Sequence, residues 1–347
     1  MRAARGRGVP AVTRKAVSAA MPDRVRGPTP DSRRARVPPA GRVVVLAVMT
    51  ALLAAACGRA EPAPDGQPRG ALTVGSGAQP GSRIIASMYA QALRKAGYEV
   101  TPGRDAGDRA GYLRALQRGE IDVMPDYLSA LTDHLDVAQN GPVTAARLPK
   151  TSGDVEHTQR NLVALLAGRP LQVGPPSPAT NQTAYAVTKE LADRESLRTM
   201  SDLVKLNGQL VLGGPAGCPA DHFCLSGLQD VYRLRFKDFK PIGPVSSKPV
   251  FTALADGTVD VGPVLSADGA VAAGSLVVLK DDKRLQHAQN ILALYRDTVP
   301  AEARAVVEQV NQALTTEKLQ ELNKKLELDG GDATNLAKRF LQDAGLV

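Results

Sequence analysis

Hydrophobic positions after residue 70 follow helical and strand periods in alternation. Ile84, Ile85, Met88 and Leu93 recur at helical spacing, so we expect a helix that Ser82 caps. Short apolar runs rich in β-branched residues predict strands. The expected strands are residues 72–74, 98–100, 121–123, 171–173, 184–187, 210–212, 259–261, 276–279 and 291–295. The first expected helix follows Ser82 and ends at Gly97. Further helices are expected at residues 112–116, 162–166, near 203, 225–232, 301–314 and 317–326, and a last one runs from an Asp332 cap to residue 346.

One short pattern occurs twice, at residues 115–123 and again 138 residues later at residues 253–261. In each copy an apolar helix end reaches a glycine, which can take the left-handed conformation that ends a helix. A β-branched residue, Asp and Val then begin a strand. Two such units predict two α/β lobes with a ligand cleft between them. The alternative is chance recurrence of a common helix-to-strand sequence.

The order of the predicted elements gives an α/β fold built as two lobes. Residues 174–178, with three prolines, end regular structure and provide the first crossing between lobes. The strand at 291–295 returns the chain to the first lobe. We therefore expect lobe 1 to comprise residues 71–175 and 290–347, and lobe 2 residues 176–289, joined by two hinge strands.

The first 56 residues have the composition of an export signal. They hold 11 Lys and Arg residues against two Asp residues, and end in an apolar run at residues 43–56. This run is too short for a permanent membrane span. Cys57 follows three alanines, which resembles a bacterial lipobox, so we expect Cys57 to carry lipid and residues 57–70 to form a linker. The alternative is an ordinary cleaved signal with an incidental Cys57.

The charge balance argues against a nucleic-acid partner. The whole chain carries +8, but the leader alone carries +9, so residues 57–347 carry about −1. The high isoelectric point therefore belongs to the export signal, and no basic surface field is left to attract nucleic acid.

The cysteine and histidine pattern favours a disulfide over a metal site. Cys218 and Cys224 stand six residues apart, and in an oxidising compartment we expect them to be bonded. A zinc site would need further ligands, but His222 is the only histidine between them. The other three histidines are scattered along the chain, so we expect no metal.

Enzyme signatures are sparse. The sequence has no G-x-S-x-G, H-E-x-x-H or P-loop motif. Gly75-Ser76-Gly77 resembles a dinucleotide-binding turn, but the next glycine, Gly81, comes one residue late and follows Pro80. We expect no catalysis and no cofactor, and an enzyme that uses the same cleft stays open as an alternative.

Tyrosines are the candidate aromatic contacts. The chain has seven Tyr and no Trp, so a cationic ligand would find its aromatic face mostly on Tyr. Tyr127 follows the strand that carries Asp122, and ligands bind at strand carboxyl ends in open α/β sheets. Each candidate has a structural alternative. Tyr127 could pack at a domain edge, Asp122 and Asp260 could bond nearby backbone, and Tyr185 could be an ordinary strand residue.

An ordered set of short segments resembles a known family, the substrate-binding proteins of ABC importers for osmoprotectants such as glycine betaine, choline and carnitine. These segments are residues 74–76, 89–91, 119–122, 125–127, 178–179, 199–203, 218–227, 259–261, 266–269 and 276–282. The resemblance implies a type II two-lobed binding protein. It also implies a monomer, tethered by lipid outside the membrane, that delivers a solute to a permease and its ATPase.

The resemblance implies ligand contacts from both lobes: Ser76, Gln79, Ser82, Asp122, Met124, Tyr127, Thr183, Tyr185, Asp221, Leu265 and Ser266. Several of these depart from the family pattern. Met124 and Leu265 stand where aromatic residues are usual, and Asp221 stands where Arg is usual. The betaine cage is therefore expected to be mostly absent, with Tyr127 retained. Because Asp221 would repel a carboxylate, we expect weaker binding of glycine betaine than of choline, unless Arg83 or Arg109 reaches the cleft.

Overall fold

The computed structural model describes residues 69–77, 79–105, 107–274 and 276–347. The predicted signal peptide, Cys57 and the linker up to residue 68 lie outside these residues. No helix in the described segments has the length and apolar character needed to cross a membrane.

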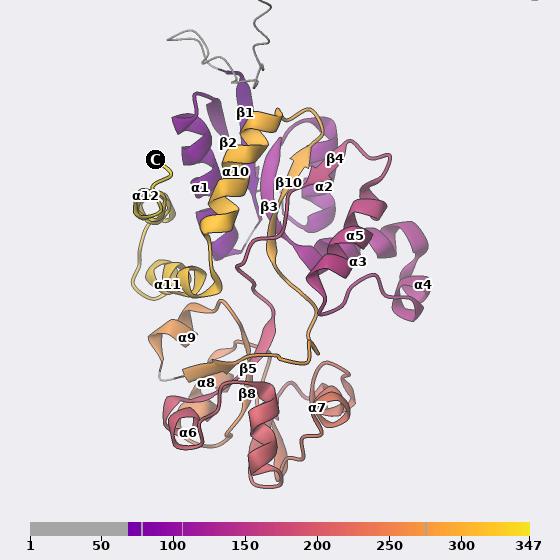
Figure 1. Cartoon of the computed structure of the whole chain (residues 1–347), viewed down its shortest axis with the longest axis vertical. Helices are drawn as coiled ribbons and strands as arrows, with labels where there is room; N and C mark the ends of the chain where they lie inside the picture. Colours follow the sequence, from indigo (N-terminus) through magenta and orange to yellow (C-terminus); the bar gives the residue numbers. More distant parts are fainter. Residues whose placement is uncertain (1–68, 78, 106, 275) are drawn as a thin grey trace, which may run out of the picture. The chain divides into compact units, whose positions relative to one another are not determined.

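A five-stranded sheet forms the core of lobe 1 (Figure 1). Its order is β2-β1-β3-β10-β4, in which β1 runs parallel to β2 and β3, and β10 runs antiparallel to β3 and β4. The strands are β1 (Ala71–Ser76), β2 (Glu99–Asp105), β3 (Val123–Tyr127), β4 (Leu171–Val173) and β10 (Ile291–Arg296). Strand β10 comes from the far end of the chain and lies inside the sheet, between β3 and β4. The C-terminal segment is thus part of lobe 1.

Helices cover both faces of this sheet. Alternate residues of β10 point to opposite faces of the sheet. Ala293 and Tyr295 belong to the apolar cluster on one face, and Leu292 and Leu294 belong to the cluster on the opposite face. The first face packs α1 (Pro80–Lys95) against α10 (Ala301–Ala313), α11 (Thr316–Glu327) and α12 (Ala333–Asp343). The second face carries α2 (Arg109–Arg118), α3 (Leu128–Asn140), α5 (Val155–Leu166) and, beyond them, α4 (Pro142–Arg147).

Lobe 2 contains two smaller sheets. The antiparallel order β8-β5-β9 uses β5 (Thr183–Thr188), β8 (Gly262–Leu265) and β9 (Leu276–Leu279), and a parallel pair joins β6 (Val211–Gly214) to β7 (Asp238–Pro241). A disulfide bonds Cys218 to Cys224, whose Cα atoms are 5.1 Å apart. The helical elements are α6 (Lys189–Arg194), the 3-10 helices η1 (Met200–Leu206) and η2 (Cys218–Ala220), α7 (Leu225–Tyr232), α8 (Lys248–Ala255) and α9 (Gly269–Ala273).

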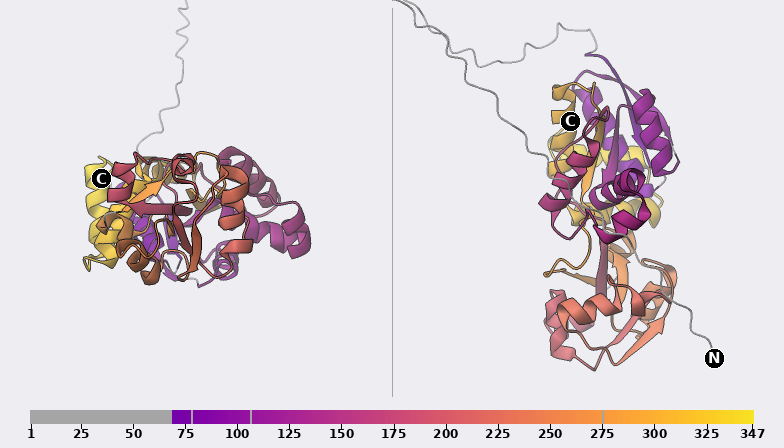
Figure 2. Two further views of the ribbon diagram at one scale, coloured as in Figure 1. Left: turned by 90° about the horizontal axis from the view of Figure 1, so that it is seen from below. Right: turned by 90° about the vertical axis from the view of Figure 1, so that its right-hand side faces the viewer.

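Two extended segments, residues 174–182 and 286–290, connect the sheets and run side by side (Figures 1 and 2). The Asn181 amide donates to the Gln289 carbonyl at 3.0 Å, and the Ile291 amide donates to the Ala179 carbonyl at 3.0 Å. All strands of the large sheet lie within residues 71–173 and 291–296, and all other strands lie within residues 183–279. The lobe boundaries given above agree with this division and stay a prediction.

The repeated sequence pattern has the same local structure in both lobes. Gly119 and Gly257 have φ values of +74° and +73°, so each takes the left-handed conformation after a helix. Asp122 Oδ2 accepts a hydrogen bond from the Thr73 amide at 2.8 Å, and Asp260 Oδ2 accepts one from the Val211 amide at 2.7 Å. Each repeat aspartate therefore fixes its turn to the strand that starts the unit.

Some predicted element boundaries were wrong. Ser82 does not cap α1, which begins at Pro80 with Gln79 as its N-cap. Proline fits this first position because its fixed φ is helical and its missing N–H has no partner there. Strands β3 and β8 start at Val123 and Gly262, later than predicted. The residues before them, which include Asp122 and Asp260, form turns instead. The element near residue 203 is a 3-10 helix, and α12 ends at Asp343.

Candidate functional site

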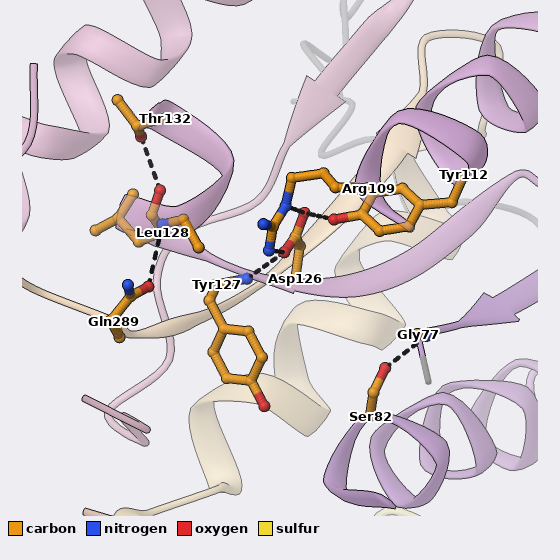
Figure 3. A network of polar contacts seen from close by, with 10 residues as sticks. Gly77, Ser82, Arg109, Tyr112, Asp126, Tyr127, Leu128, Thr132 and Gln289 are labelled. Atoms are coloured by element: carbon orange, nitrogen blue, oxygen red, sulfur yellow. Dashed lines mark hydrogen bonds and ion pairs between the residues drawn. The ribbon is translucent and has the colours of Figure 1, made fainter. Parts of the chain in front are cut away.

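A pocket of about 190 Å³ lies in lobe 1, where β1 and β3 end and α1 and α2 begin (Figure 3). Strand ends that meet helix starts are the usual ligand position in open α/β sheets. A larger groove of about 630 Å³ lies along β2 and α2, but none of the described residues that line it is aromatic. The smaller pocket is lined by Gly77, Gln79, Ser82, Gly107, Arg109, Tyr112, Met124, Pro125, Asp126 and Tyr127.

Asp126 is the polar centre of this pocket. Its side chain is only 3% exposed, and it forms an ion pair with Arg109, whose Nη2 lies 2.8 Å from Oδ1. Arg109 Nε donates to Oδ2 at 3.3 Å, and the Tyr112 hydroxyl donates to the same oxygen. The Tyr127 amide donates to Oδ1 at 2.8 Å. These bonds connect β3 to the start of α2.

The charges in this network stabilise one another. Burial acts to lower the pKa of Arg109, but the hydrogen bonds and the charge of Asp126 outweigh burial and raise that pKa. Burial, followed by the Asp126 charge, raises the pKa of the Tyr112 phenol. Arg109 and Tyr112 are three residues apart and therefore lie on one face of α2. With these raised pKa values, Arg109 stays protonated and Tyr112 stays a neutral donor.

The first turn of α1 forms another wall of the pocket. The Gly77 amide donates to Ser82 Oγ at 2.9 Å, which holds the loop after β1 against the helix. The Gln79 N-cap makes no side-chain hydrogen bond, and the first turn carries no acidic residue. The positive end of the helix dipole at α1 is thus not compensated by a side chain of its own first turn.

Tyr127 ends β3 and precedes α3 without an intervening loop. It pairs with Ile291 in the sheet, and the next amide, of Leu128, donates to the Asn290 carbonyl at 2.9 Å. Burial raises the pKa of the Tyr127 phenol, and a hydrogen bond with Asn181 opposes this effect. Its ring is therefore positioned between the lobe 1 pocket and the connecting segments.

The predicted contacts of lobe 1 fall into two groups. Gln79, Ser82, Met124 and Tyr127 line the pocket together. Ser76 and Asp122 do not line it. Asp122 is occupied structurally, because Arg296 Nε donates to Oδ1 at 2.9 Å and the Thr73 amide donates to Oδ2. Asp122 thus bonds backbone near its turn, which is the structural alternative stated above for this residue.

The five predicted contacts of lobe 2 do not line this pocket. The Tyr185 side chain is buried, and its hydroxyl donates to the Phe223 carbonyl at 3.0 Å. Ser266 Oγ donates to the Thr180 carbonyl at 2.9 Å. Asp221 is exposed and accepts a hydrogen bond from the Phe223 amide. The remaining two, Thr183 and Leu265, are paired across β5 and β8. Ligand contact by any of the eleven residues stays a prediction.

Sequence reasoning did not assign Tyr112 or Asp126 to the site, and named Arg109 only as a residue that could rescue a carboxylate. A signal was present, because Asp126 directly precedes Tyr127 at the strand end. Among the described residues, no group of three or more His, Cys, Asp or Glu side chains is placed to hold a metal ion.

A five-stranded sheet and two smaller sheets, flanked by helices and joined by paired extended segments, define the two-lobed type II fold of solute-binding proteins. Solved structures share this fold. The ligand-free form of YehZ from Escherichia coli has a TM-score of 0.68 at 21% identity, covering 80% of this chain and 99% of that one. A structure described as a glycine betaine/carnitine/choline ABC transporter has a TM-score of 0.67 at 22% identity, covering 79% and 99%.

Residues 70–343 match the family model for the substrate-binding domain of ABC-type glycine betaine transport systems, and the chain belongs to this family. A carnitine transport binding protein of Listeria monocytogenes is 27% identical over 169 residues, 47% of this chain. The aligned region spans only 53% of that relative's length. A glycine-betaine-binding protein of Pseudomonas aeruginosa is 24% identical over 284 residues, 76% of this chain and 85% of the relative.

Proposed function

We propose that this protein is the extracytoplasmic substrate-binding component of an ABC importer, which captures a quaternary ammonium compound or a similar small polar solute. The observation that carries the proposal is the pocket in which Tyr127 lies beside an ordered polar network at the strand ends. Family membership supports it. The solute is bound between the lobes and passed to a permease driven by its ATPase, and the protein acts as a monomer.

The chemistry of the pocket suits such a solute. A quaternary ammonium group has no N–H to donate, so it binds to aromatic faces and to oxygen atoms. Tyr127 provides one such face from lobe 1. Further contacts come from lobe 2 on closure, and Thr183, Tyr185, Asp221, Leu265 and Ser266 remain the residues proposed for them.

Two alternatives have distinct readouts. The first is the same importer role for a solute other than a betaine, which a binding screen with amino acids and other polar metabolites would reveal. The second is an enzyme that uses the same cleft, which chemical conversion of a bound compound would reveal. We propose binding without turnover, because the family is one of transporter binding proteins.

Replacing Tyr127 with Ala should weaken solute binding by about 1 to 2 kcal/mol, because the cation loses its aromatic face. Isothermal titration of the purified chain with glycine betaine, carnitine and choline measures this. Tyr127→Phe is the matched control, because it keeps the ring and removes the hydroxyl that bonds Asn181. Unchanged binding by Tyr127→Ala would show that this ring does not contact the solute.

Membrane attachment is proposed to depend on Cys57, which follows the lipobox-like alanines. The variant Cys57→Ser should release the protein from the membrane fraction, because the lipid has no other attachment point in this proposal. Cell fractionation followed by immunoblotting measures the distribution. A Cys57→Ser protein that stays fully membrane-bound would contradict lipid attachment at this residue.

A further inference from the structure

The second connecting segment is bonded to lobe 2 before His287 and to lobe 1 after it. Gln286 Nε2 donates to the Phe223 carbonyl of lobe 2 at 2.6 Å. The Ala288 amide donates to the Ser152 carbonyl, in the loop of lobe 1 that precedes α5, at 2.9 Å. The segment can therefore turn at His287 without breaking either attachment.

The His287 side chain contacts both lobes. Its ring packs against that of Phe223 with centroids 4.5 Å apart, in an edge-to-face arrangement. Its Nδ1 lies 3.1 Å from Thr151 Oγ1, and the Thr151 hydroxyl donates to Asp133 Oδ1 on α3 at 2.7 Å. That hydroxyl has a single hydrogen, so Nδ1 carries the proton that is donated to Thr151. The ring is thus held between an aromatic contact in lobe 2 and a polar relay in lobe 1.

Two opposing effects act on the charge of His287. Burial is the larger effect and lowers its pKa, and the negative charge of Asp133 raises it by less. The ring therefore resists protonation in this arrangement of the lobes, although it is bonded through Thr151 to a carboxylate.

The other charged groups on the neighbouring elements have partners of their own or lie in solvent. Asp154, at the start of α5, is paired with Arg284, whose Nη1 lies 2.9 Å from Oδ2. In the disulfide loop, residues 218–224, the Asp221 carboxylate accepts from a backbone amide of the same loop. His222 in that loop is exposed. Asp133 is therefore the charge through which the surroundings act on His287.

These contacts belong to an arrangement in which the residues proposed as lobe 2 ligand contacts do not line the lobe 1 pocket. Closing the lobes on a solute changes the distance between Phe223 in lobe 2 and Thr151 in lobe 1, and the His287 ring cannot follow both. Whichever contact opens, the ring is uncovered. Because burial is the larger effect on its pKa, uncovering the ring raises that pKa.

We propose that Phe223, His287 and Thr151 form a proton-sensitive latch between the lobes, which holds them in the arrangement described here and gives way when they close on a solute. The inference rests on the proposed solute-binding function, and it assigns control of affinity to residues outside the pocket. Contacts made in one of two arrangements favour that arrangement, so the latch opposes closure and weakens binding.

The sign of the pH dependence follows from the ring. In the latched arrangement the pKa of His287 lies below its ordinary value of 6.5, and in the closed arrangement it returns toward that value. Closure is therefore accompanied by proton uptake. Solute affinity rises as the pH falls through the range between the two pKa values.

Isothermal titration of the purified full-length chain with glycine betaine, carnitine and choline tests the proton linkage, because none of these compounds changes protonation near neutral pH. We expect affinity to rise about threefold from about pH 8 to about pH 5.5, with proton uptake seen as a dependence of the binding heat on the buffer. His287→Gln should abolish both effects. His134→Gln is the control, because His134 is half-buried on α3 and its pKa is also lowered, first by burial. Affinity independent of pH, or a pH dependence lost in His134→Gln and kept in His287→Gln, would overturn the proposal.

Removing the aromatic side of the latch tests its effect on closure. Phe223→Ala should tighten the binding of every solute that binds by the same factor, about threefold, because it acts on the lobes and not on the solute. Val231→Ala, at a partly exposed apolar position on α7 of the same lobe, should leave affinity unchanged. Unchanged or weaker binding by Phe223→Ala would overturn the latch.

Failure of all three compounds to bind would count against the importer role, and the latch is then decided on the solute-free protein. Nuclear magnetic resonance of the His287 ring should give a pKa below the ordinary value, and Phe223→Ala should raise it. The same titration in both proteins would overturn the latch.

Discussion

Replacing Asp126 with Ala is expected to lower the free energy of unfolding by about 3 kcal/mol or more, because it breaks a buried ion pair from one side. The change leaves Arg109 without its counter-ion and the buried Tyr112 hydroxyl without its acceptor. The Tyr127 amide loses a partner as well. Urea denaturation of the ligand-free protein, followed by circular dichroism, measures the loss.

The exposed carboxylate of Asp230 on α7 supplies the control, since Asp230→Ala should change the free energy of unfolding by less than about 0.5 kcal/mol. The double variant Asp126→Ala/Arg109→Leu should be less damaged than the sum of the single variants, because the two residues are in contact. A loss below about 1 kcal/mol for Asp126→Ala would mean that solvent replaces the network at little cost.

The fold could be predicted because most of its signals are local. Helix and strand periods, glycine helix ends and the proline-rich crossing at residues 174–178 each act over a few residues. The place of β10 between β3 and β4 depends on distant partners, but its apolar sequence still predicted a strand that returns the chain to lobe 1. Elements without a boundary signal were missed. Helix α3, for example, follows Tyr127 with neither a loop nor a side-chain cap.

The candidate site was only partly predictable. Tyr127 was identified because its position at a strand end is itself a local feature. The Asp126 network joins residues 14 and 17 positions apart on separate elements, and nothing local in the sequence indicates that these side chains meet. Nearness in sequence was a poor guide for Asp122. It lies close to Tyr127 in the chain, but its carboxylate bonds Arg296 and the Thr73 amide.

The two repeat aspartates should differ in their contribution to stability although their sequence pattern is shared. Asp122→Ala should cost about 3 kcal/mol, since it removes both a backbone hydrogen bond and a largely buried ion pair with Arg296. Asp260→Ala should cost about 1 to 2 kcal/mol, because Asp260 accepts from the Val211 amide and has no ion pair among the described residues.

Parallel urea denaturations of Asp122→Ala, Asp260→Ala and Asp122→Asn separate the two contributions. Asp122→Asn retains an oxygen for the Thr73 amide and loses the charge opposite Arg296, so its stability should lie between those of the wild type and Asp122→Ala. Equal losses for Asp122→Ala and Asp260→Ala would show that the ion pair contributes nothing beyond the shared backbone bond. The larger loss expected at Asp122 follows from its place in the sheet, where Arg296 at the end of β10 ties the C-terminal strand to the turn before β3.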